Sequence, residues 1–300
     1  MMAMPVIAVA GATGKLGGQV VANLRARGAD VCALVRSGAA ADKVEALERS
    51  GARVARVDMT SADELAKACV GASCVVSALQ GLRDVIVETQ SMLLDAAIAA
   101  RVPRFVPSDY AIDFMKLPAG TNRNFDLRRA FHERLDTASV QATSILNGCF
   151  TEVLTYGTPL LDFENKRVGY WGSADQKMDF TTMAETAAFT AAAALDASTP
   201  KVLRVAGDQL TARELADVAS DATGTKLELV RMGSLDELTA WIQRERAADP
   251  ASEAQVFPKW QASQYIHDMF DGRAKLQPLD NARYPNLSWK SVRDVNAALH

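Results

Sequence analysis

The chain has 300 residues, of which 49% are hydrophobic and 23% are charged, and its formal net charge at pH 7 is −3. These values are typical of a globular protein and exclude the strongly basic surface that nucleic-acid binding needs. No apolar run approaches the length of about 20 residues that a transmembrane helix requires. The chain also begins without the basic and apolar segments of a secretory signal, so we expect a cytoplasmic protein without membrane or nucleic-acid partners.

The sequence offers little for a metal site or a disulfide framework. The cysteines are scattered in or beside apolar segments, which predicts buried, reduced thiols: Cys32, Cys69, Cys74 and Cys149. The histidines lie far apart and lack the spacing of metal ligands: His132, His267 and His300. We therefore expect no bound metal.

The first half of the chain alternates between short apolar runs and segments with helical periodicity. The apolar runs predict six strands at Val6–Ala10, Asp30–Val35, Arg53–Val57, Cys74–Leu79, Arg104–Pro107 and Ala142–Asn147. Helices are expected between them at Leu16–Arg27, Ala40–Arg49, Ala62–Cys69, Ile86–Ala100 and Phe125–Asp136. Ser61 and Glu64 predict a capping box before the third helix. This alternation predicts an α/β fold of the Rossmann type, with a doubly wound parallel sheet.

The second half of the chain is less regular. Strands are expected at Val168–Gly172, Val202–Val205 and Lys226–Val230, and helices at Met183–Leu195, from Thr211 to about Ala222, and at Leu235–Arg246. Thr211 and Glu214 predict a second capping box. From Asp249 onward, aromatic residues stand among turn-forming residues. We expect residues 1–155 to form a dinucleotide-binding domain, and residues 156–300 to form a smaller α/β substrate lobe with returning elements that does not fold alone.

The first predicted strand leads into a turn that contains three closely spaced glycines. Gly11 allows a sharp exit from the strand, Gly14 allows the backbone to approach a pyrophosphate, and Gly17 allows close packing of helix on strand. The free amides and the dipole at the start of the next helix attract phosphate. We therefore predict that a dinucleotide contacts Gly11, Thr13, Gly14, Lys15, Leu16 and Gly17.

Arg36 follows the second predicted strand, where folds that prefer NAD usually place an acidic residue for the ribose diol. A guanidinium suits a 2′-phosphate instead, and Lys15 could add a second positive charge, so the sequence favours NADP(H). Asp58, after the third strand, either contacts the adenine amino group or serves only the entry to a helix. Residues at the end of the fourth strand are expected along the cofactor: Ser77, Ala78 and Gln80.

Three sequences carry a resemblance to a known family: Gly-Ala-Thr-Gly-x-x-Gly from Gly11, Arg104-Phe105-Val106-Pro107-Ser108-Asp109-Tyr110, and Asn147-Gly148-Cys149-Phe150. Together they resemble the NmrA-like group of atypical short-chain dehydrogenases/reductases, which includes the isoflavone reductases. The segment Met178–Thr182 is similar to a later part of the family pattern. The resemblance implies that Asn147, Cys149 and Phe150 line the nicotinamide pocket. Cys149 is expected as a wall residue, because no nearby histidine or cationic cluster would activate its thiol.

The catalytic lysines of two related enzyme types are missing. No tyrosine is followed by a lysine four residues later, so the Tyr-x-x-x-Lys pair of ordinary short-chain dehydrogenases is absent. Isoflavone-type reductases use a lysine on a later helix, and the resemblance places Arg128 or Arg129 there. Arginine keeps the positive charge but cannot act as a base near neutral pH. Arg128 would then polarise a carbonyl or hold an anion while Tyr110 donates a proton, or it belongs only to a charged helix face.

Other residues leave open a role in the site or in packing. Lys116, in the loop before that helix, is either a further catalytic candidate or an ordinary surface lysine. Four aromatic residues would form either a substrate wall or part of the core: Phe150, Tyr156, Tyr170 and Trp171.

These features predict an NADP(H)-dependent oxidoreductase that transfers a hydride to a small carbonyl or aromatic substrate. The alternative is a regulator of the NmrA type, which binds the dinucleotide without turnover and contacts a protein partner. The missing lysines favour the regulator, whereas the aromatic residues of the second half favour the enzyme, which we prefer. A nucleotide-sugar epimerase is a weaker alternative, since that class also relies on Tyr-x-x-x-Lys. Whether the chain forms a homodimer is left open.

Overall fold

The computed structural model describes residues 4–156 and 158–297. The chain divides into two compact units, each built from three segments. Unit 1 comprises Met1–Tyr110, Leu127–Ile145 and Thr186–Leu203, and unit 2 comprises Ala111–Asp126, Leu146–Glu185 and Arg204–His300. The chain passes repeatedly from one unit to the other, so these units do not coincide with a single boundary at residue 155.

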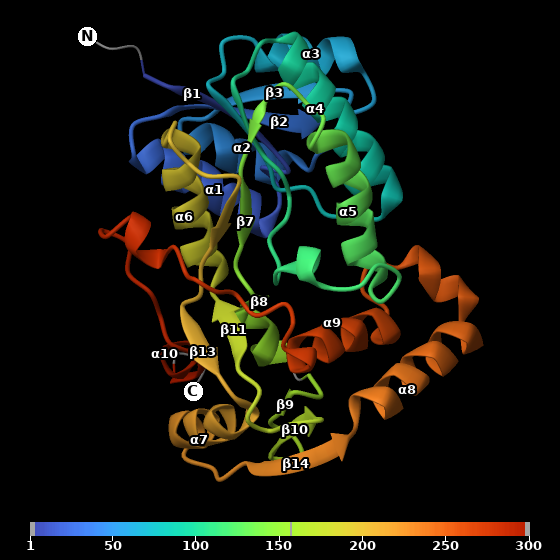
Figure 1. The fold of residues 1–300 in the computed structure, drawn as a ribbon. Coiled ribbons are helices and arrows are strands. Elements are labelled where there is room, and N and C mark those ends of the chain that lie inside the picture. The colour runs from blue at the N-terminus through green and yellow to red at the C-terminus, as the bar shows by residue number, and fades with distance from the viewer. Residues whose placement is uncertain (1–3, 157, 298–300) are drawn as a thin grey trace. The chain divides into compact units, whose positions relative to one another are not determined.

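Unit 1 contains a six-stranded parallel sheet with the order β3-β2-β1-β4-β5-β6 (Figure 1). The strands are β1 (Val6–Ala10), β2 (Asp30–Arg36), β3 (Arg53–Val57), β4 (Cys74–Ser77), β5 (Arg104–Val106) and β6 (Gln141–Ala142). In the register, Ala8 of β1 lies between Cys32 of β2 and Val75 of β4. The predicted doubly wound sheet is confirmed, and its apolar central strands are buried because helices cover both faces.

Among the residues that the structure describes, six helices contribute to unit 1: α1 (Lys15–Ala26), α2 (Ala41–Arg49), α3 (Ala62–Cys69), α4 (Gln90–Ala99), most of α5 (Arg123–Leu135) and most of α6 (Met183–Leu195). A π-helical segment, η1 (Asp84–Thr89), leads into α4. Leu65 of α3, Leu94 of α4 and Phe131 of α5 share one buried cluster with strand residues such as Phe105. Figure 1 shows α1, α2 and α6 on the other side of the sheet.

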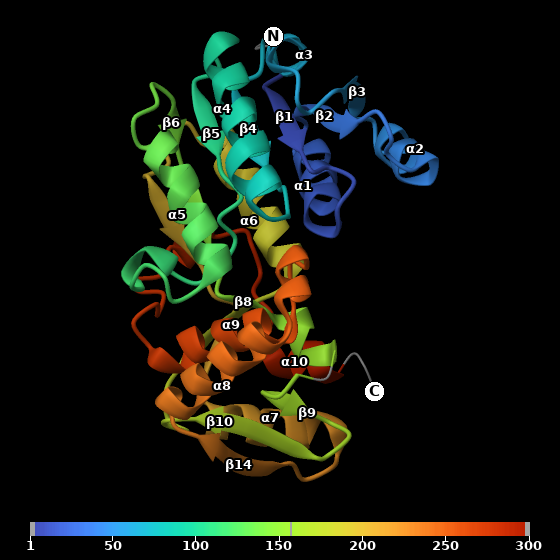
Figure 2. The ribbon, with the colours of Figure 1, turned by 90° about the vertical axis from the view of Figure 1, so that its right-hand side faces the viewer.

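The described residues of unit 2 form two small sheets and four complete helices. Figure 2 labels several of these elements. One sheet has the order β14-β10-β9, made of β9 (Leu161–Asp162), β10 (Arg167–Trp171) and β14 (Glu228–Gly233). The other has the order β13-β11-β8, made of β8 (Cys149–Phe150), β11 (Met178–Thr181) and β13 (Asp208–Leu210). The helices are α7 (Ala212–Thr223), α8 (Leu235–Ala248), α9 (Lys259–Asp271) and α10 (Val292–Ala297). Four short 3-10 helices also occur: η2 (Phe114–Lys116), η3 (Thr151–Tyr156), η4 (Pro250–Ala254) and η5 (Asn281–Arg283).

The structure corrects three local predictions. The strand expected at Ala142–Asn147 is interrupted at Thr143, because β7 (Ser144–Leu146) leaves the six-stranded sheet and pairs with β12 (Val202–Arg204). The region after Asp249, for which no helix was predicted, contains α9 and α10. The capping box at Thr211 is present, but the one at Ser61 is only half formed, since the Glu64 carboxylate accepts the Asp58 N–H at 2.8 Å.

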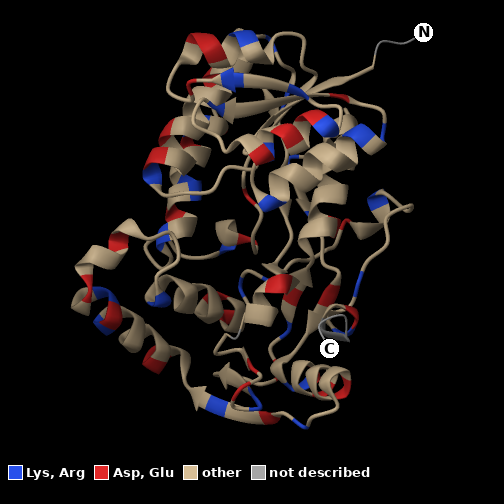
Figure 3. Ribbon diagram, turned by 180° about the vertical axis from the view of Figure 1, so that it is seen from behind, with Lys and Arg blue, Asp and Glu red and all other residues tan. Residues whose placement is uncertain are grey.

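The distribution of charged and apolar residues in the folded chain agrees with the composition of the sequence. Lysines and arginines are interspersed with aspartates and glutamates along the elements of both units (Figure 3). Within residues 4–156 and 158–297, no helix is both long and apolar enough to span a bilayer. The four cysteines are free thiols, and three of them are buried.

Candidate functional site

The glycine turn joins β1 to α1 in unit 1, and its glycines serve different purposes. A Cβ at Gly11, where φ is +78°, would lie 2.4 Å from the Ala78 carbonyl oxygen. A Cβ at Gly17 would lie 2.2 Å from the Gly11 oxygen, so internal packing alone requires both of these glycines. Gly14 is exposed, and a Cβ there would approach only the Gly11 oxygen, at 3.2 Å. The bare backbone at Gly14 therefore leaves surface that a pyrophosphate can approach closely.

The start of α1 has the electrostatics of an anion site. Gly14 caps the helix without any side-chain hydrogen bond, and the first turn contains no acidic residue. The first backbone N–H groups of a helix lack intrahelical acceptors, and the helix dipole adds partial positive charge. Lys15 begins the helix, where a cation is unfavourable unless an anion binds. Thr13 and Leu16 lie half-buried beside these amides, so the turn fits the phosphates of a dinucleotide.

Arg36 and Asp58 end neighbouring strands of the same sheet. Arg36 is exposed at the end of β2, which pairs with β1 and therefore ends at the same edge as the glycine turn. Asp58 is exposed after β3, and its Oδ1 accepts hydrogen bonds from the Thr60 N–H at 2.8 Å and the Thr60 hydroxyl at 2.6 Å. These bonds hold the pKa of Asp58 below its usual value. Asp58 thus orders the entry to α3, and its contact with adenine stays a prediction.

The end of β4 lies beside the glycine turn. Ser77 is fully buried, and its hydroxyl has no hydrogen-bond partner among the residues that the structure describes. The Ala78 N–H donates to the Ala10 oxygen at 2.9 Å, and Gln80 is exposed beyond it. Because buried polar groups are normally satisfied, the Ser77 hydroxyl can take a ligand or water as its partner.

The segment Ser108–Tyr110 follows β5 and is held from three sides within unit 1. The Ser108 hydroxyl donates to the Leu79 oxygen at 2.7 Å, and the Ser108 N–H donates to Gln90 Oε1 at 2.9 Å. Arg128 Nε, from α5, donates to the Ser108 oxygen at 3.2 Å. Gln90 directly follows the π-helical turn, a feature found frequently at functional sites. The structure therefore brings Arg128 to the segment that contains Tyr110, whereas the role of Gln90 was not predicted.

Tyr110 is buried, with 7% of its surface exposed. Its hydroxyl makes no hydrogen bond of standard geometry within the described part of the chain. Burial raises the pKa of Tyr110, and the nearby Thr190 hydroxyl offsets only part of this rise. The phenol therefore stays protonated at neutral pH, and it can act as a proton donor only to an atom that reaches this buried position.

Asp109, His132 and Ser144 form a buried polar cluster that the sequence reasoning did not find. Asp109 Oδ2 lies 2.7 Å from His132 Nε2 and accepts a hydrogen bond from the Ser144 hydroxyl at 2.7 Å. Burial alone would lower the pKa of His132, but the Asp109 and Asp136 carboxylates together outweigh it and hold this pKa above its usual value. Nothing in the sequence around these three residues indicates that they meet, so no local signal could have found the cluster.

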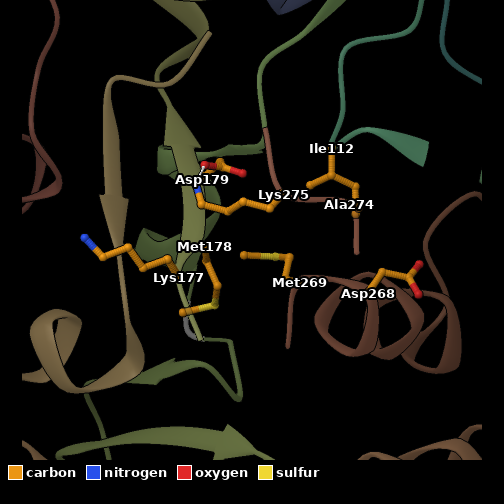
Figure 4. A pocket seen from close by; sticks show the side chains of 8 residues that line it. All are labelled: Ile112, Lys177, Met178, Asp179, Asp268, Met269, Ala274 and Lys275. Atoms are coloured by element: carbon orange, nitrogen blue, oxygen red, sulfur yellow. Dashed lines mark hydrogen bonds and ion pairs between the residues drawn. The ribbon is translucent and has the colours of Figure 1, made fainter. Parts of the chain in front are cut away.

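Lys116 lies in unit 2 and belongs to an ion-pair network. Its Nζ is 3.1 Å from Asp113 Oδ2 and donates to the Lys275 oxygen at 2.9 Å, while Arg204 Nε donates to Asp113 at 2.9 Å. This arrangement favours a structural role for Lys116. Beside Lys275, whose ammonium pairs with Asp179, there is a cavity of about 10 Å³ (Figure 4). That volume accommodates about one water molecule.

Asn147, Cys149 and Phe150 also lie in unit 2, in and before β8. The Asn147 side chain is fully buried, and neither its oxygen nor its nitrogen has a hydrogen-bond partner among the described residues. Burial, with the Glu152 carboxylate adding to it, raises the pKa of the Cys149 thiol to about 12, which argues against a nucleophile. Asn147 thus has unsatisfied polar atoms that a ligand group could pair with, and its contact with the cofactor stays a prediction.

The four aromatic residues that were expected to form either a substrate wall or part of the core differ in their burial. Trp171 is buried and contacts Phe270, with ring centroids 6.0 Å apart. Tyr156 is 63% exposed, while Phe150 and Tyr170 are half-buried. Trp171 therefore belongs to the core of unit 2. Apart from His300, which lies outside the described residues, the structure shows no cluster of three or more histidine, cysteine or acidic side chains that could hold a metal.

A sequence model of the NmrA-like family matches residues 4–270. A comparison with curated proteins finds no match. Among solved structures, isoflavone reductase is 19% identical with a TM-score of 0.84, over 99% of this chain and 100% of that one.

Two structures solved with cofactor are also similar. AtPrR2 with NADP+ and (+)pinoresinol is 21% identical with a TM-score of 0.83, over 100% of both chains. Leucoanthocyanidin reductase from Vitis vinifera, in its binary complex with NADPH, is 20% identical with a TM-score of 0.82, over 98% of both chains. The chain therefore has the fold of these reductases over nearly its whole length.

Proposed function

Because this chain belongs to the NmrA-like family, we propose that it is an NADP(H)-dependent reductase that transfers a hydride to a small carbonyl or aromatic substrate. The observation that carries the proposal is the anion site at Gly14 and the start of α1, with Arg36 at the same sheet edge. The similarity to AtPrR2 and leucoanthocyanidin reductase, which were solved with NADP+ and NADPH, supports the choice of cofactor.

In this proposal the cofactor is held mainly by unit 1. The amides of the Gly11–Gly17 turn bind the pyrophosphate, and Arg36 with Lys15 binds the 2′-phosphate. When bound, the nicotinamide cofactor supplies the hydride. Arg128 stabilises the negative charge that develops on the substrate, because its guanidinium stays charged and acts electrostatically. Tyr110 is the proposed proton donor.

The second candidate function is a regulator that binds NADP(H) without turnover and contacts a protein partner. The observation that favours it is the lack of a lysine base: arginine stands at position 128, and Lys116 is engaged with Asp113. The burial of the Tyr110 hydroxyl also favours a binding protein.

One assay separates the two functions. The purified protein is titrated with NADPH and NADH, and NADPH consumption is followed over a panel of quinones, enones, aldehydes and aromatic ethers. A reductase consumes NADPH with at least one substrate class and forms an equal amount of reduced product. A regulator binds NADPH but consumes none, and a protein that binds neither cofactor contradicts both functions.

The Arg36→Ala substitution is expected to reduce the preference for NADPH over NADH. The loss should be about 1–3 kcal/mol, the usual range for hydrogen bonds to a charged group. Isothermal titration with both cofactors measures it, and affinity for NADH should stay nearly constant. Arg56→Ala is the matched control, because Arg56 is also exposed but lies within the neighbouring strand β3. Equal affinity of the unmodified protein for NADPH and NADH would refute the assignment.

A further inference from the structure

Unit 1 contains a buried ion pair that the proposed reaction does not use. Asp109 has no exposed surface and His132 is only 6% exposed, yet their Oδ2 and Nε2 atoms lie 2.7 Å apart. A buried carboxylate is costly unless a cation and hydrogen bonds compensate it. Here the imidazolium supplies the charge, and the Ser144 hydroxyl supplies a second hydrogen bond at 2.7 Å.

The ion pair joins α5, which carries Arg128, to the Ser108–Tyr110 segment, which carries Tyr110. Ser108, just before Asp109, accepts the hydrogen bond from Arg128, and Tyr110 comes just after. Arg128 and His132 are four residues apart on α5 and therefore lie on the same face of this helix. Through them, this face contacts the segment at Ser108 and at Asp109. Releasing His132 from Asp109 would leave the Asp109 side chain held by Ser144 alone and so loosen the chain between the Arg128 contact and Tyr110.

The charged groups around His132 determine which protonation state is present. Asp109, in the segment after β5, faces Nε2 of His132. Asp136, which directly follows α5, faces Nδ1 of the same ring at 3.8 Å. Lys201 lowers the pKa of His132 only weakly, because its ammonium is paired with Asp136 at 2.8 Å. Two carboxylates outweigh burial and one paired lysine, so the pKa of His132 lies above its usual value of about 6.5.

We propose that protonated His132 is a positioning residue, which holds the Ser108–Tyr110 segment against α5 and so sets the geometry of Arg128 and Tyr110. The proposal rests on the reductase function for its effect on turnover. Ser144 supports the carboxylate of Asp109 and is not a nucleophile, since its hydroxyl proton is donated to that carboxylate.

The sign of the pH dependence follows from the raised pKa. The stabilisation that the imidazolium contributes is fully present below the unfolded-state pKa of about 6.5, and it is lost as the pH rises through the higher folded-state value. The segment should therefore be well held at acidic pH and released at alkaline pH. Turnover should fall over the same alkaline range.

The first measurement uses the unmodified full chain and requires no turnover. NMR titration gives the pKa of His132, and hydrogen exchange, corrected for its intrinsic pH dependence, gives the protection of the amides from Ser108 to Tyr110. We expect His132 to titrate above about 6.5, and the protection to fall by about tenfold over the same pH range. A His132 that titrates below this value, or protection that does not follow its titration, overturns the proposal.

The second measurement compares His132→Gln with His267→Gln, since His267 faces Asp268 in unit 2 and serves as the matched control. His132→Gln should lower kcat by about 10- to 100-fold, as expected for misplaced reacting groups, with the Kd for NADPH within about twofold. The alkaline fall in turnover should disappear in His132→Gln and persist in His267→Gln. A folded His132→Gln protein with unchanged kcat overturns the positioning role. If protection follows the His132 titration but the unmodified protein consumes no NADPH, the ion pair holds the segment as proposed and the reductase function fails.

Discussion

Replacing Gly14 by valine is expected to weaken NADPH binding by at least about 100-fold, because two or more hydrogen bonds to charged phosphate are lost at about 1.5–3 kcal/mol each. The valine side chain would occupy the exposed surface where the pyrophosphate approaches the backbone. The fold should survive, since Gly14 has φ −80° and ψ 166°, which valine adopts readily. Isothermal titration measures the affinity, and thermal unfolding followed by circular dichroism reports the fold.

The matched control for this substitution is Ala40→Val. Ala40 caps α2 as Gly14 caps α1, in extended backbone, exposed, and without a side-chain hydrogen bond. Adding the same branched side chain at this second helix start should leave NADPH binding unchanged. A folded Gly14→Val protein that retained full affinity would place the phosphate site somewhere other than the glycine turn.

Removing the charge of Arg128 or the hydroxyl of Tyr110 should lower turnover by about ten- to a thousand-fold, the range for losing one electrostatic partner or one proton donor. The resemblance to isoflavone-type reductases places Arg128 or Arg129 where those enzymes use a lysine, so the guanidinium at position 128 is the proposed source of positive charge beside the segment that contains Tyr110. Arg128→Ala and Tyr110→Phe should both leave NADPH affinity nearly constant, because neither group is proposed to hold the phosphates. Steady-state kinetics with the best substrate of the panel, together with NADPH titrations, test this.

Arg129→Ala provides the control for Arg128→Ala. Both arginines are half-buried on α5, but it is Arg128 that donates to the Ser108 oxygen. Turnover of Arg129→Ala should therefore stay close to that of the unmodified protein. If turnover survives Tyr110→Phe, the buried tyrosine is a core residue; if it survives both substitutions at Arg128 and Tyr110, the residue assignment fails while the reductase function stands.

The local pattern of apolar residues in the sequence was sufficient to predict most strands and helices of unit 1. The predicted bounds of β1, β3 and α3 equal those of the structure, those of β2 differ by one residue at its C-terminal end, and those of α1 differ by one residue at each end. Strands of a parallel sheet are buried on both faces, so they appear in the sequence as short apolar runs between helical periods. The glycine turn is equally local, because the strand, the turn and the helix that form it are consecutive in the chain.

The tertiary structure alone decided the contacts between distant residues. Asp109 lies 23 residues from His132 and 35 from Ser144, and nothing in their separate surroundings in the sequence indicates that they meet. The same applies to Lys116, which pairs with the nearby Asp113 but also donates to the distant Lys275 oxygen, while its catalytic role stays a prediction.

The helix α9 shows most clearly why apolar periodicity in the sequence does not predict every helix. Its buried residues include Gln261, Gln264 and Asp268 beside Trp260 and Phe270, so its buried face is not apolar. Asn122 donates to Asp268 at 2.8 Å and accepts from Gln261 at 2.9 Å, and these bonds make the polar burial tolerable. The sequence by itself therefore determined the elements whose stability comes from apolar burial and local turns. Only the tertiary structure decided which polar side chains are buried, because their burial depends on partners that lie far away along the chain.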